Sequence, residues 1–315
     1  MTPKKLMIIG SFVVDLAMKS PALPKRGETV FGGPFSMGPG GKGSNQCIAA
    51  KRAGADVIFL TKIGRDQFAQ VALDAYAAEG IDTTFVYRDE VRETGCALIM
   101  VEDVTGENAI GVSSGACQKI TAHEIESLVP VMEEARVMLT QFETNMDAVW
   151  MALQLAKKKG LMTIVNPAPV QVVADEIYQY IDVITPNETE AQTLTGIWIH
   201  DPKDAAKAAD VLLAKGAKHV LITLGENGVY YRSAEEEELF KGFTVKKVID
   251  TTGAGDAFNG GLASALTEGR SMKEAIVFAN AAGALSVTKN GTAPAMPFRS
   301  EIDTFIHQSF NKNIG

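Results

Sequence analysis

The sequence predicts an α/β protein whose mostly parallel, doubly wound sheet carries helices on both faces. Short apolar runs rich in β-branched residues alternate with stretches of helical character along the chain. Parallel strands that are buried on both faces and joined by crossover helices produce this alternation. The runs that we expect to form the strands are 6–9, 57–61, 137–140, 162–165, 183–185 and 220–223.

Sequence signals mark the ends of helices between these strands. Asp201 is a candidate N-cap followed by a first-turn proline, and it opens a helix that we expect to end at Gly216. Asn145 is a candidate cap for another helix that runs to Gly160. The acidic run 235–238 predicts a solvated turn that leads from a strand at 229–231 to residues 243–248.

Four further runs depart from the alternation, because helices do not separate all of them. Residues 12–18, 29–37, 96–101 and 108–112 have strand character and predict a small separate sheet. No repeat or low-complexity linker divides the chain. We therefore expect one domain over residues 1–315, with the small sheet inserted in it.

Composition limits the classes of partner. Hydrophobic residues make up 46% and charged residues 22% of the chain, as in ordinary globular proteins. A formal net charge of -8 without a cluster of lysines and arginines argues against binding to nucleic acid. The three cysteines form no CxxC pair, and the N-terminal apolar run is too short for a signal peptide or membrane span. We expect a cytoplasmic protein with no membrane partner.

The segment 250–260 carries the strongest chemical signal. Gly253 and Gly255 let backbone N–H groups converge on one point, and a helix that begins near Gly255 adds its unpaired amides and its dipole. Such a point binds phosphate. Asp256 would lie beside the phosphate, where a carboxylate can take a proton from an attacking hydroxyl. The alternative is that Asp256 is only an N-cap after a glycine turn.

Two motifs in this chain resemble the signatures of one enzyme family. The run 250–256 matches D-T-x-G-A-G-D of the ribokinase-like sugar kinases, the PfkB family, and 40–45 matches their G-G-K-G-x-N run. Within the family the chain is most similar to the ribokinases. The resemblance implies a ribokinase-like fold in which the small sheet is a lid over the sugar and the contact of a homodimer. It also covers Gly10-Ser11 with Asp15, 166–169, 185–190 and 223–225.

The resemblance implies transfer of the γ-phosphate of ATP to the primary 5-hydroxyl of a pentose, with Mg²⁺ as cofactor. In that reaction Asp256 accepts the proton of the hydroxyl, and the amides of Gly253, Ala254 and Gly255 stabilise charge on the phosphate. A sugar- or nucleotide-binding regulator on the same fold is the alternative from a different class. Such a regulator would have lost the acid or the glycines, and both are present.

A set of polar positions matches the family's sugar site. A carboxylate after a strand can accept from two adjacent hydroxyls, and a glycine-rich turn at a helix entry can present amide and ammonium donors. Without the resemblance, the same residues would be an ordinary turn acid and an ordinary helix entry. The matching residues are Asp15, Gly41, Lys42, Asn45, Glu143 and Asp256.

The resemblance also assigns nucleotide and Mg²⁺ positions. Asn187 and Glu190 stand three residues apart at the start of a predicted helix, so they share a face and would organise Mg²⁺ through water. A purely local interpretation makes the same pair a capping box. The positions that match the ATP site are Asn187, Thr223, Gly225, Gly228, Gly255 and Asn280.

A K⁺ site beside the anion site is a further implication. Most of its ligands would be backbone carbonyls, which every residue has, so the side chains there are weak evidence. We expect activation by K⁺ over Na⁺, although Ala295 stands where a serine is expected. The matching positions are Asp250, Thr252, Ser286, Lys289 and Gly291.

Val13 is the main departure from the ribokinases, which have asparagine there in a G-S-x-N-x-D stretch. Valine cannot bond a hydroxyl, and a lost hydrogen bond costs about 0.5–1.5 kcal/mol. Val13 therefore favours 2-deoxyribose, whereas the overall resemblance favours D-ribose. A nucleoside kinase is a third interpretation, in which Phe12 and Val13 form part of an apolar wall for a base.

Overall fold

A computed structural model describes residues 4–105 and 107–311, so the two ends of the predicted 1–315 domain and residue 106 lie outside the described residues. Within the described residues, nine strands form one large sheet. From one edge to the other they are β13 (Glu237–Phe240), β12 (Val229–Ser233), β11 (His219–Thr223), β10 (Val183–Ile184), β9 (Met162–Asn166), β8 (Ala135–Gln141), β1 (Lys5–Ile9), β4 (Val57–Ile63) and β5 (Val86–Arg88).

The large sheet is mostly parallel, as the sequence predicts. All neighbouring pairs from β11 through β5 are parallel, and β12 and β13 join antiparallel at one edge. Each of the six predicted strands overlaps a strand of this sheet.

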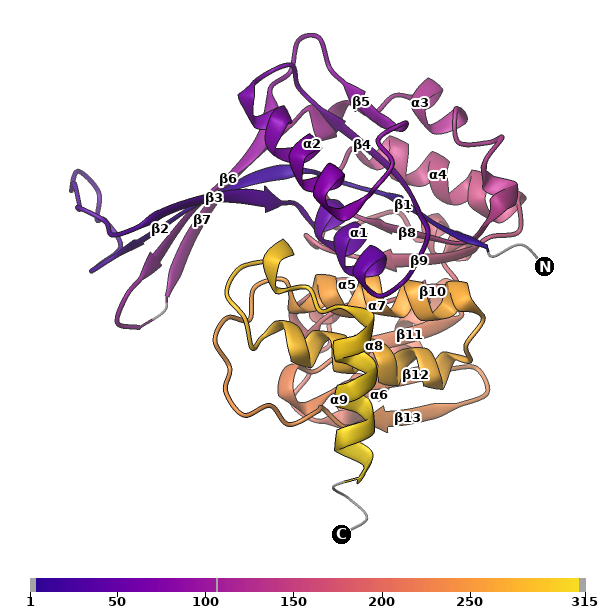
Figure 1. Cartoon of the computed structure of the whole chain (residues 1–315). Coiled ribbons are helices and arrows are strands. Elements are labelled where there is room, and N and C mark those ends of the chain that lie inside the picture. Colours follow the sequence, from indigo (N-terminus) through magenta and orange to yellow (C-terminus); the bar gives the residue numbers. More distant parts are fainter. Residues whose placement is uncertain (1–3, 106, 312–315) are drawn as a thin grey trace.

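Helices cover both faces of the large sheet (Figure 1). Strand β1 shows why, because Leu6 and Ile8 enter one apolar core while Met7 and Ile9 enter the other. On the first face lie α1 (Lys42–Arg52), α2 (Gln67–Glu79), α7 (Ala254–Glu268), α8 (Met272–Ser286) and α9 (Arg299–Asn311). On the second lie α3 (Ala122–Glu126), α4 (Met146–Lys158), α5 (Glu188–Thr195) and α6 (Pro202–Lys215). None of the helices in the described part of the chain could cross a membrane by length and hydropathy.

The predicted small sheet is present and projects from the body of the molecule (Figure 1). Its inner strands pair in parallel, and each outer strand is antiparallel to its neighbour. The strand order is β3 (Phe35–Gly40), β2 (Val13–Ser20), β6 (Thr94–Glu102) and β7 (Asn108–Gly115).

Two local predictions were wrong in part. The strand expected at 29–37 forms only from Phe35, because glycines and Pro34 precede it and proline has no N–H to donate to a ladder. Only the first half of the acidic run lies in the turn between β12 and β13, because Glu237 and Glu238 open the edge strand β13 and pair with Arg232 and Lys273.

The predicted helix ends are largely confirmed. Asp201 caps α6 through bonds to the amides of Lys203 and Asp204. Asn145 stands at the N-cap position of α4, but its side chain instead bonds both backbone groups of Ile120. It therefore ties the start of α4 to the preceding connection.

Helices α1 and α7 approach each other closely, and a glycine permits the contact. A Cβ on Gly260 would lie 2.6 Å from Ala49 Cβ and 2.7 Å from the Gln46 carbonyl oxygen, which is closer than atoms can pack. Gly260 lies one turn after Asp256 on the same face of α7. The close contact at Gly260 therefore places Asp256 next to the start of α1.

Candidate active site

Asp256 is buried in the first turn of α7. The N-cap of this helix is Gly253, whose φ of 80° lies in the left-handed region, so the interpretation of Asp256 as the cap is wrong. The Asp256 carboxylate instead faces α1. Its Oδ2 accepts from Asn45 Nδ2 at 3.0 Å, and its Oδ1 accepts from Gln46 Nε2 at 2.9 Å.

Charges around Asp256 set its protonation and that of Lys42. Burial raises the pKa of Asp256, while Lys42 and the amides of Gln46 and Asn45 act in the opposite direction. Burial lowers the pKa of Lys42, but the carboxylates of Asp256, Glu143 and Glu190 outweigh burial and raise it. Lys42 is therefore a half-buried ammonium group with carboxylates as neighbours.

A cavity of about 170 Å³ opens over the start of α7 and brings together most of the predicted phosphate residues. It also includes residues for which the sequence offered no role, Asn166 among them. Its lining residues are Lys42, Asn166, Ala168, Thr185, Asn187, Glu190, Thr223, Thr251, Gly253, Ala254, Gly255, Asp256 and Asn259.

The amides of this turn are not all directed at the cavity. The Ala254 N–H donates to the Thr251 carbonyl at 3.2 Å. The first amides of a helix have no partner within the helix, so the turn around Gly253 and Gly255 remains a place where an anion is stabilised. A phosphate there would lie beside the ammonium of Lys42.

Asn187 and Glu190 form a capping box, so the local interpretation of this pair is confirmed. The Glu190 N–H donates to Asn187 Oδ1 at 2.8 Å, and the Asn187 N–H donates to Glu190 Oε2 at 2.9 Å. Both residues nevertheless line the cavity. Burial raises the pKa of Glu190, although the Asn187 amide and Lys42 counteract it. Among residues 4–105 and 107–311, His, Cys, Asp and Glu form no cluster of three or more that could hold a metal ion.

The predicted sugar residues also converge. Glu143 Oε2 accepts from the Lys42 backbone N–H at 2.8 Å and from the hydroxyl of Ser11. Asp15 on β2 accepts from Thr292 Oγ1 at 3.1 Å. Burial raises the pKa of Asp15 to about 6 despite that bond, and Glu143 and Asp256 contribute as neighbouring negative charges.

Gly41 makes the turn into α1 compact. Its φ is 86°, and a Cβ there would lie 2.8 Å from the Val13 backbone nitrogen. This contact brings the start of α1 against β2. Val13 and Asp15 alternate with Val14 along β2 and therefore point to the same side of the small sheet.

Two apolar positions bear on the sugar alternatives. Val13 is buried, and its Cγ1 lies 2.8 Å from where a Cβ on Gly95 would be, so it packs over the adjacent strand. Phe12 is also buried, with its ring edge-on to Tyr76 at 6.0 Å. The suggestion that Phe12 forms a wall for a base is therefore wrong.

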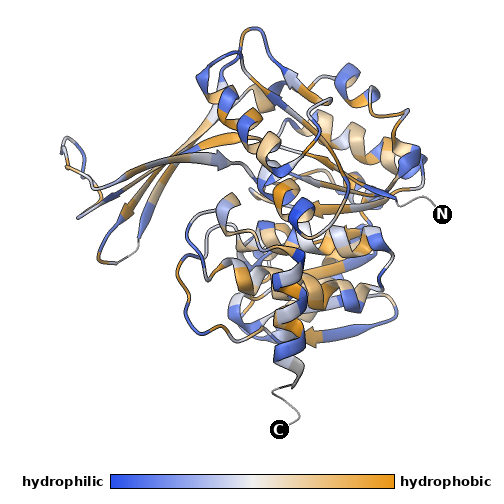
Figure 2. Cartoon of the chain, in the orientation of Figure 1, coloured by the Kyte–Doolittle hydropathy of each residue, from blue (hydrophilic) through white to orange (hydrophobic). Residues whose placement is uncertain are grey.

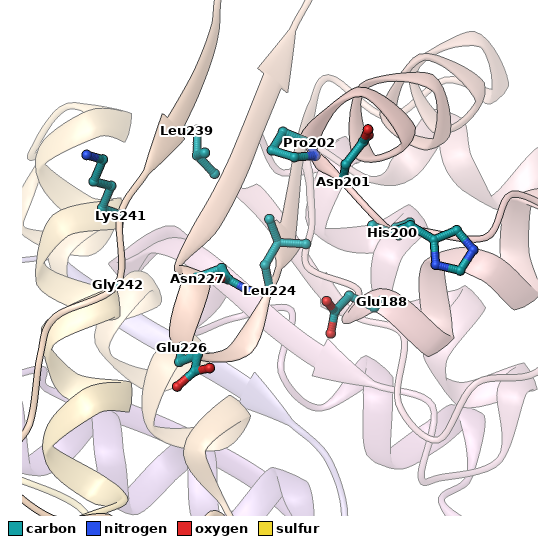
Figure 3. A pocket seen from close by; sticks show the side chains of 11 residues that line it. Glu188, His200, Asp201, Pro202, Leu224, Glu226, Asn227, Leu239, Lys241 and Gly242 are labelled. Atoms are coloured by element: carbon teal, nitrogen blue, oxygen red, sulfur yellow. The ribbon is translucent and has the colours of Figure 1, made fainter.

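A larger cavity of about 510 Å³ adjoins the predicted nucleotide turn (Figure 3). It is lined by Leu224, Glu226 and Asn227 of the turn and by Glu188 and His200 across from them. Neighbours in sequence connect it with the smaller cavity, since Thr223 and Asn187 line one cavity while Leu224 and Glu188 line the other.

The turn itself depends on two predicted glycines. Gly225 and Gly228 have φ of 54° and 101°, and a Cβ on Gly228 would lie 2.0 Å from the Phe240 carbonyl oxygen. Asn280 does not line either cavity in the described part of the chain. It is buried and donates from Nδ2 to the Lys241 carbonyl at 2.9 Å, so it supports a residue of the larger cavity.

The predicted K⁺ positions lie on two segments that contact each other. Asp250 accepts from the amides of Thr252 and Gly291, both at 2.9 Å. The Ser286 hydroxyl donates to the Gly283 carbonyl at 2.8 Å. Lys289 points toward α9 and pairs with Glu301 at 2.8 Å. Its side chain therefore serves as an ion-pair partner there.

Sequence reasoning assigned no role to Gln46 or Asn259, and it named Ser11 and Asn166 only as parts of runs that match the family. Gln46 follows Asn45 directly and stands in an otherwise small and apolar stretch of α1, where a buried amide needs a polar partner. That was the available signal. The partner of Gln46, Asp256, lies far away in the sequence, so pattern alone could not supply it.

Comparison with known proteins agrees with this geometry. The model of the pfkB family carbohydrate kinases matches residues 3–299. The ribokinase of Haemophilus influenzae is 42% identical over 97% of this chain and 99% of its own, and the deoxyribokinase of Salmonella typhi is 33% identical over 96% and 98%. The structure of Arabidopsis thaliana ribokinase complexed with ribose and ATP has a TM-score of 0.89 and 28% identity, covering 97% of this chain and 99% of that chain. The chain belongs to the pfkB family of carbohydrate kinases.

Proposed function

We propose that this kinase transfers the γ-phosphate of ATP to the primary 5-hydroxyl of D-ribose. The observation that carries the proposal is Asp256, a buried carboxylate at a cavity that it shares with Lys42 and the glycine turn of α7. The 42% identity to a ribokinase over nearly the full length supports ribose as the sugar. The sugar is held by Asp15, Gly41, Lys42, Asn45 and Glu143.

The mechanism follows from the positions of the charges. Asp256 accepts the proton of the attacking hydroxyl, because its carboxylate lines the cavity together with Lys42 and the glycine turn. Lys42 and the amides around Gly253 and Gly255 stabilise negative charge on the transferring phosphate. The nucleoside end of ATP extends toward Gly225 and Gly228, because the carboxylates that line the larger cavity repel phosphate.

Mg²⁺ fits the acidic side of the phosphate cavity. Glu190 and Asn187 line it, and one side-chain oxygen of each already accepts a hydrogen bond of the capping box. They would therefore hold the ion through water, which Mg²⁺ commonly retains. When bound, Mg²⁺ neutralises charge on the phosphates.

Asp256→Asn is expected to lower kcat by about 10² to 10⁴. The amide cannot accept the proton, but it keeps the shape of the side chain, so folding and ATP binding should persist. Steady-state kinetics and calorimetric ATP titration would measure both. The surface variant Asp74→Asn is the matched control. Turnover near that of the unmodified protein would contradict the assignment.

The choice of sugar depends on Val13, which favours 2-deoxyribose as the competing substrate. We expect kcat/KM to be higher for D-ribose than for 2-deoxy-D-ribose. In Val13→Asn the preference for ribose should increase by up to about tenfold, since one new hydrogen bond contributes about 0.5–1.5 kcal/mol. Parallel assays with both sugars would test this, and a clear preference for deoxyribose would instead make Val13 the specificity determinant.

We also propose a K⁺ site formed by Asp250, Thr252, Ser286 and Gly291, with Lys289 contributing only backbone. The support is the contact between the two segments, in which Asp250 bonds the Gly291 amide. Activity should be higher in KCl than in NaCl at equal ionic strength, with choline chloride as the baseline. Equal rates in KCl and NaCl would rule out the site.

The small sheet is proposed to be a lid over the sugar and the contact of a homodimer. Apolar residues colour its projecting strands in Figure 2, and Phe35, Met37, Leu98, Ile110 and Val112 are each more than half exposed. The strand registers place Phe35, Met37 and Leu98 on one face of the small sheet, and Ile110 and Val112 on the other face with Asp15. An exposed apolar face is typical of an interaction site, so the face of Leu98 is the proposed dimer contact. In this proposal the lid strands are insertions in one kinase domain.

We also propose a cytoplasmic location, with which the free cysteines are consistent.

Sedimentation should therefore show a dimer at micromolar concentration. Leu98→Asp should shift the protein toward monomer, because it places a charge in the apolar surface. Val172→Asp, at an exposed position outside the small sheet, is the control. A monomer for the unmodified chain would remove the dimer from the proposal.

A further inference from the structure

A chain of buried amide side chains lies behind Asp256. Gln46 Nε2 donates to Asp256 Oδ1 at 2.9 Å and to Asn166 Oδ1 at 3.0 Å. Gln46 Oε1 accepts from Gln141 Nε2 at 2.6 Å. Both glutamines are fully buried. The chain joins the base on α7 to α1 and to the carboxyl ends of β8 and β9.

The direction of this chain follows from the carboxylate at its end. An ionised carboxylate can only accept hydrogen bonds, so Gln46 must present its amide nitrogen to Asp256. Its oxygen then faces Gln141, which must present a nitrogen in turn. Reversing either amide would set two oxygens against each other in a buried site, where an unpaired polar group is costly.

Together with Asn45, Gln46 engages both oxygens of Asp256. Rotation of a carboxyl group about its last side-chain bond is only weakly restrained by intrinsic preference. Donors on both oxygens therefore define the plane of the group and direct its remaining lone pairs. Asp256 and Asn166 line the cavity of about 170 Å³ over the start of α7. Gln46 and Gln141 are not among the described residues that line it.

We propose that Gln46, supported by Gln141, is a positioning residue for phosphoryl transfer, which orients the Asp256 carboxylate without touching either substrate. The inference rests on the proposed role of Asp256 as the base. It assigns to Gln46 a function apart from that of its neighbour Asn45, which faces the sugar as well as the acid.

The first test is a comparison of kcat with KM. Gln46→Met keeps the length of the side chain and removes its donor and acceptor, so kcat should fall about tenfold to a hundredfold, as expected when a reacting group is misplaced. KM for D-ribose should change less than twofold, since the sugar residues are untouched. Ser44→Ala is the matched control, because it removes a buried hydrogen bond of α1, to Tyr76, away from Asp256. Thermal unfolding would verify that each variant is folded.

A double-mutant cycle separates positioning from simple loss of stability. Gln141→Met should lower kcat by a smaller factor, because it acts only through Gln46. The double variant Gln46→Met/Gln141→Met should be no slower than Gln46→Met alone. If the two single variants lose kcat independently, so that their losses add in the double variant, the proposed positioning role is wrong. It is also wrong if Gln46→Met folds and keeps its kcat. If Gln46→Met does not fold, Gln141→Met and the isosteric Gln46→Glu, which should lose kcat through repulsion of Asp256, decide the question.

The pH profile gives a second measurement. Loss of the Gln46 donor removes a stabilising contact from the ionised acid, so the acidic limb of kcat should move up by about one pH unit or more. The charged groups that face Asp256 are Lys42 on α1, Glu143 after β8, Glu190 on α5 and Asp15 on β2. The profile of kcat is measured at saturating sugar. The bound sugar then occupies Asp15, so titration of Asp15 in the free enzyme contributes little to this profile.

The outcomes distinguish the two proposals. Full turnover by Asp256→Asn would contradict the proposed function itself. An inactive Asp256→Asn combined with unchanged kcat and pH profile in Gln46→Met would leave the function standing and overturn only the positioning role.

Discussion

The contact between α1 and α7 at Gly260 determines most of the geometry of the site. With no side chain at Gly260, the two helices approach until its Cα region meets Ala49 and the Gln46 carbonyl. Asp256 is one turn away on the same face, so it is buried against Asn45 and Gln46 as a direct result. A larger residue at Gly260 would separate the acid from both donors. The close packing of α1 and α7 therefore also determines the position of the Asp256 carboxylate.

That burial brings several carboxylates close together, and the ammonium group of Lys42 offsets part of their negative charge. Asp15, Glu143, Asp256 and Glu190 all act on one region, and burial raises the pKa of Asp15, Asp256 and Glu190. Lys42 opposes the effect at Asp256 and Glu190, and its own pKa is raised in return. Sugar hydroxyls donate to carboxylates, whereas phosphate needs positive charge. Lys42 lines the same cavity as Asp256, Glu190 and the glycine turn, so its positive charge acts on both the acids and an anion bound there.

The sequence was sufficient for the features that depend on local pattern. Alternating apolar runs predicted the parallel sheet, and the turn at Gly253 was recognisable from its glycines, whose conformational freedom the positive φ of Gly253 uses. Gly225 and Gly228 were predicted from the family resemblance alone, and their positive φ explains why glycine stands there. The start of β3 was misplaced because strand propensity at 29–34 is overridden by the glycines and Pro34. Gln46 was missed because its meaning depends on Asp256, and a contact between residues far apart in sequence leaves no local signal.

The small sheet and the C-terminal segment connect the two ends of the chain at the sugar site. Thr292 donates to Asp15, and it follows Gly291, whose amide is held by Asp250. Asp250 in turn bonds the Thr252 amide directly before the glycine turn of α7. A continuous set of hydrogen bonds therefore runs from the start of α7 through the proposed cation segment to the carboxylate on β2. Because Asp15 lies on β2 of the projecting sheet, this set of hydrogen bonds links the small sheet to the start of α7, where Asp256 lies.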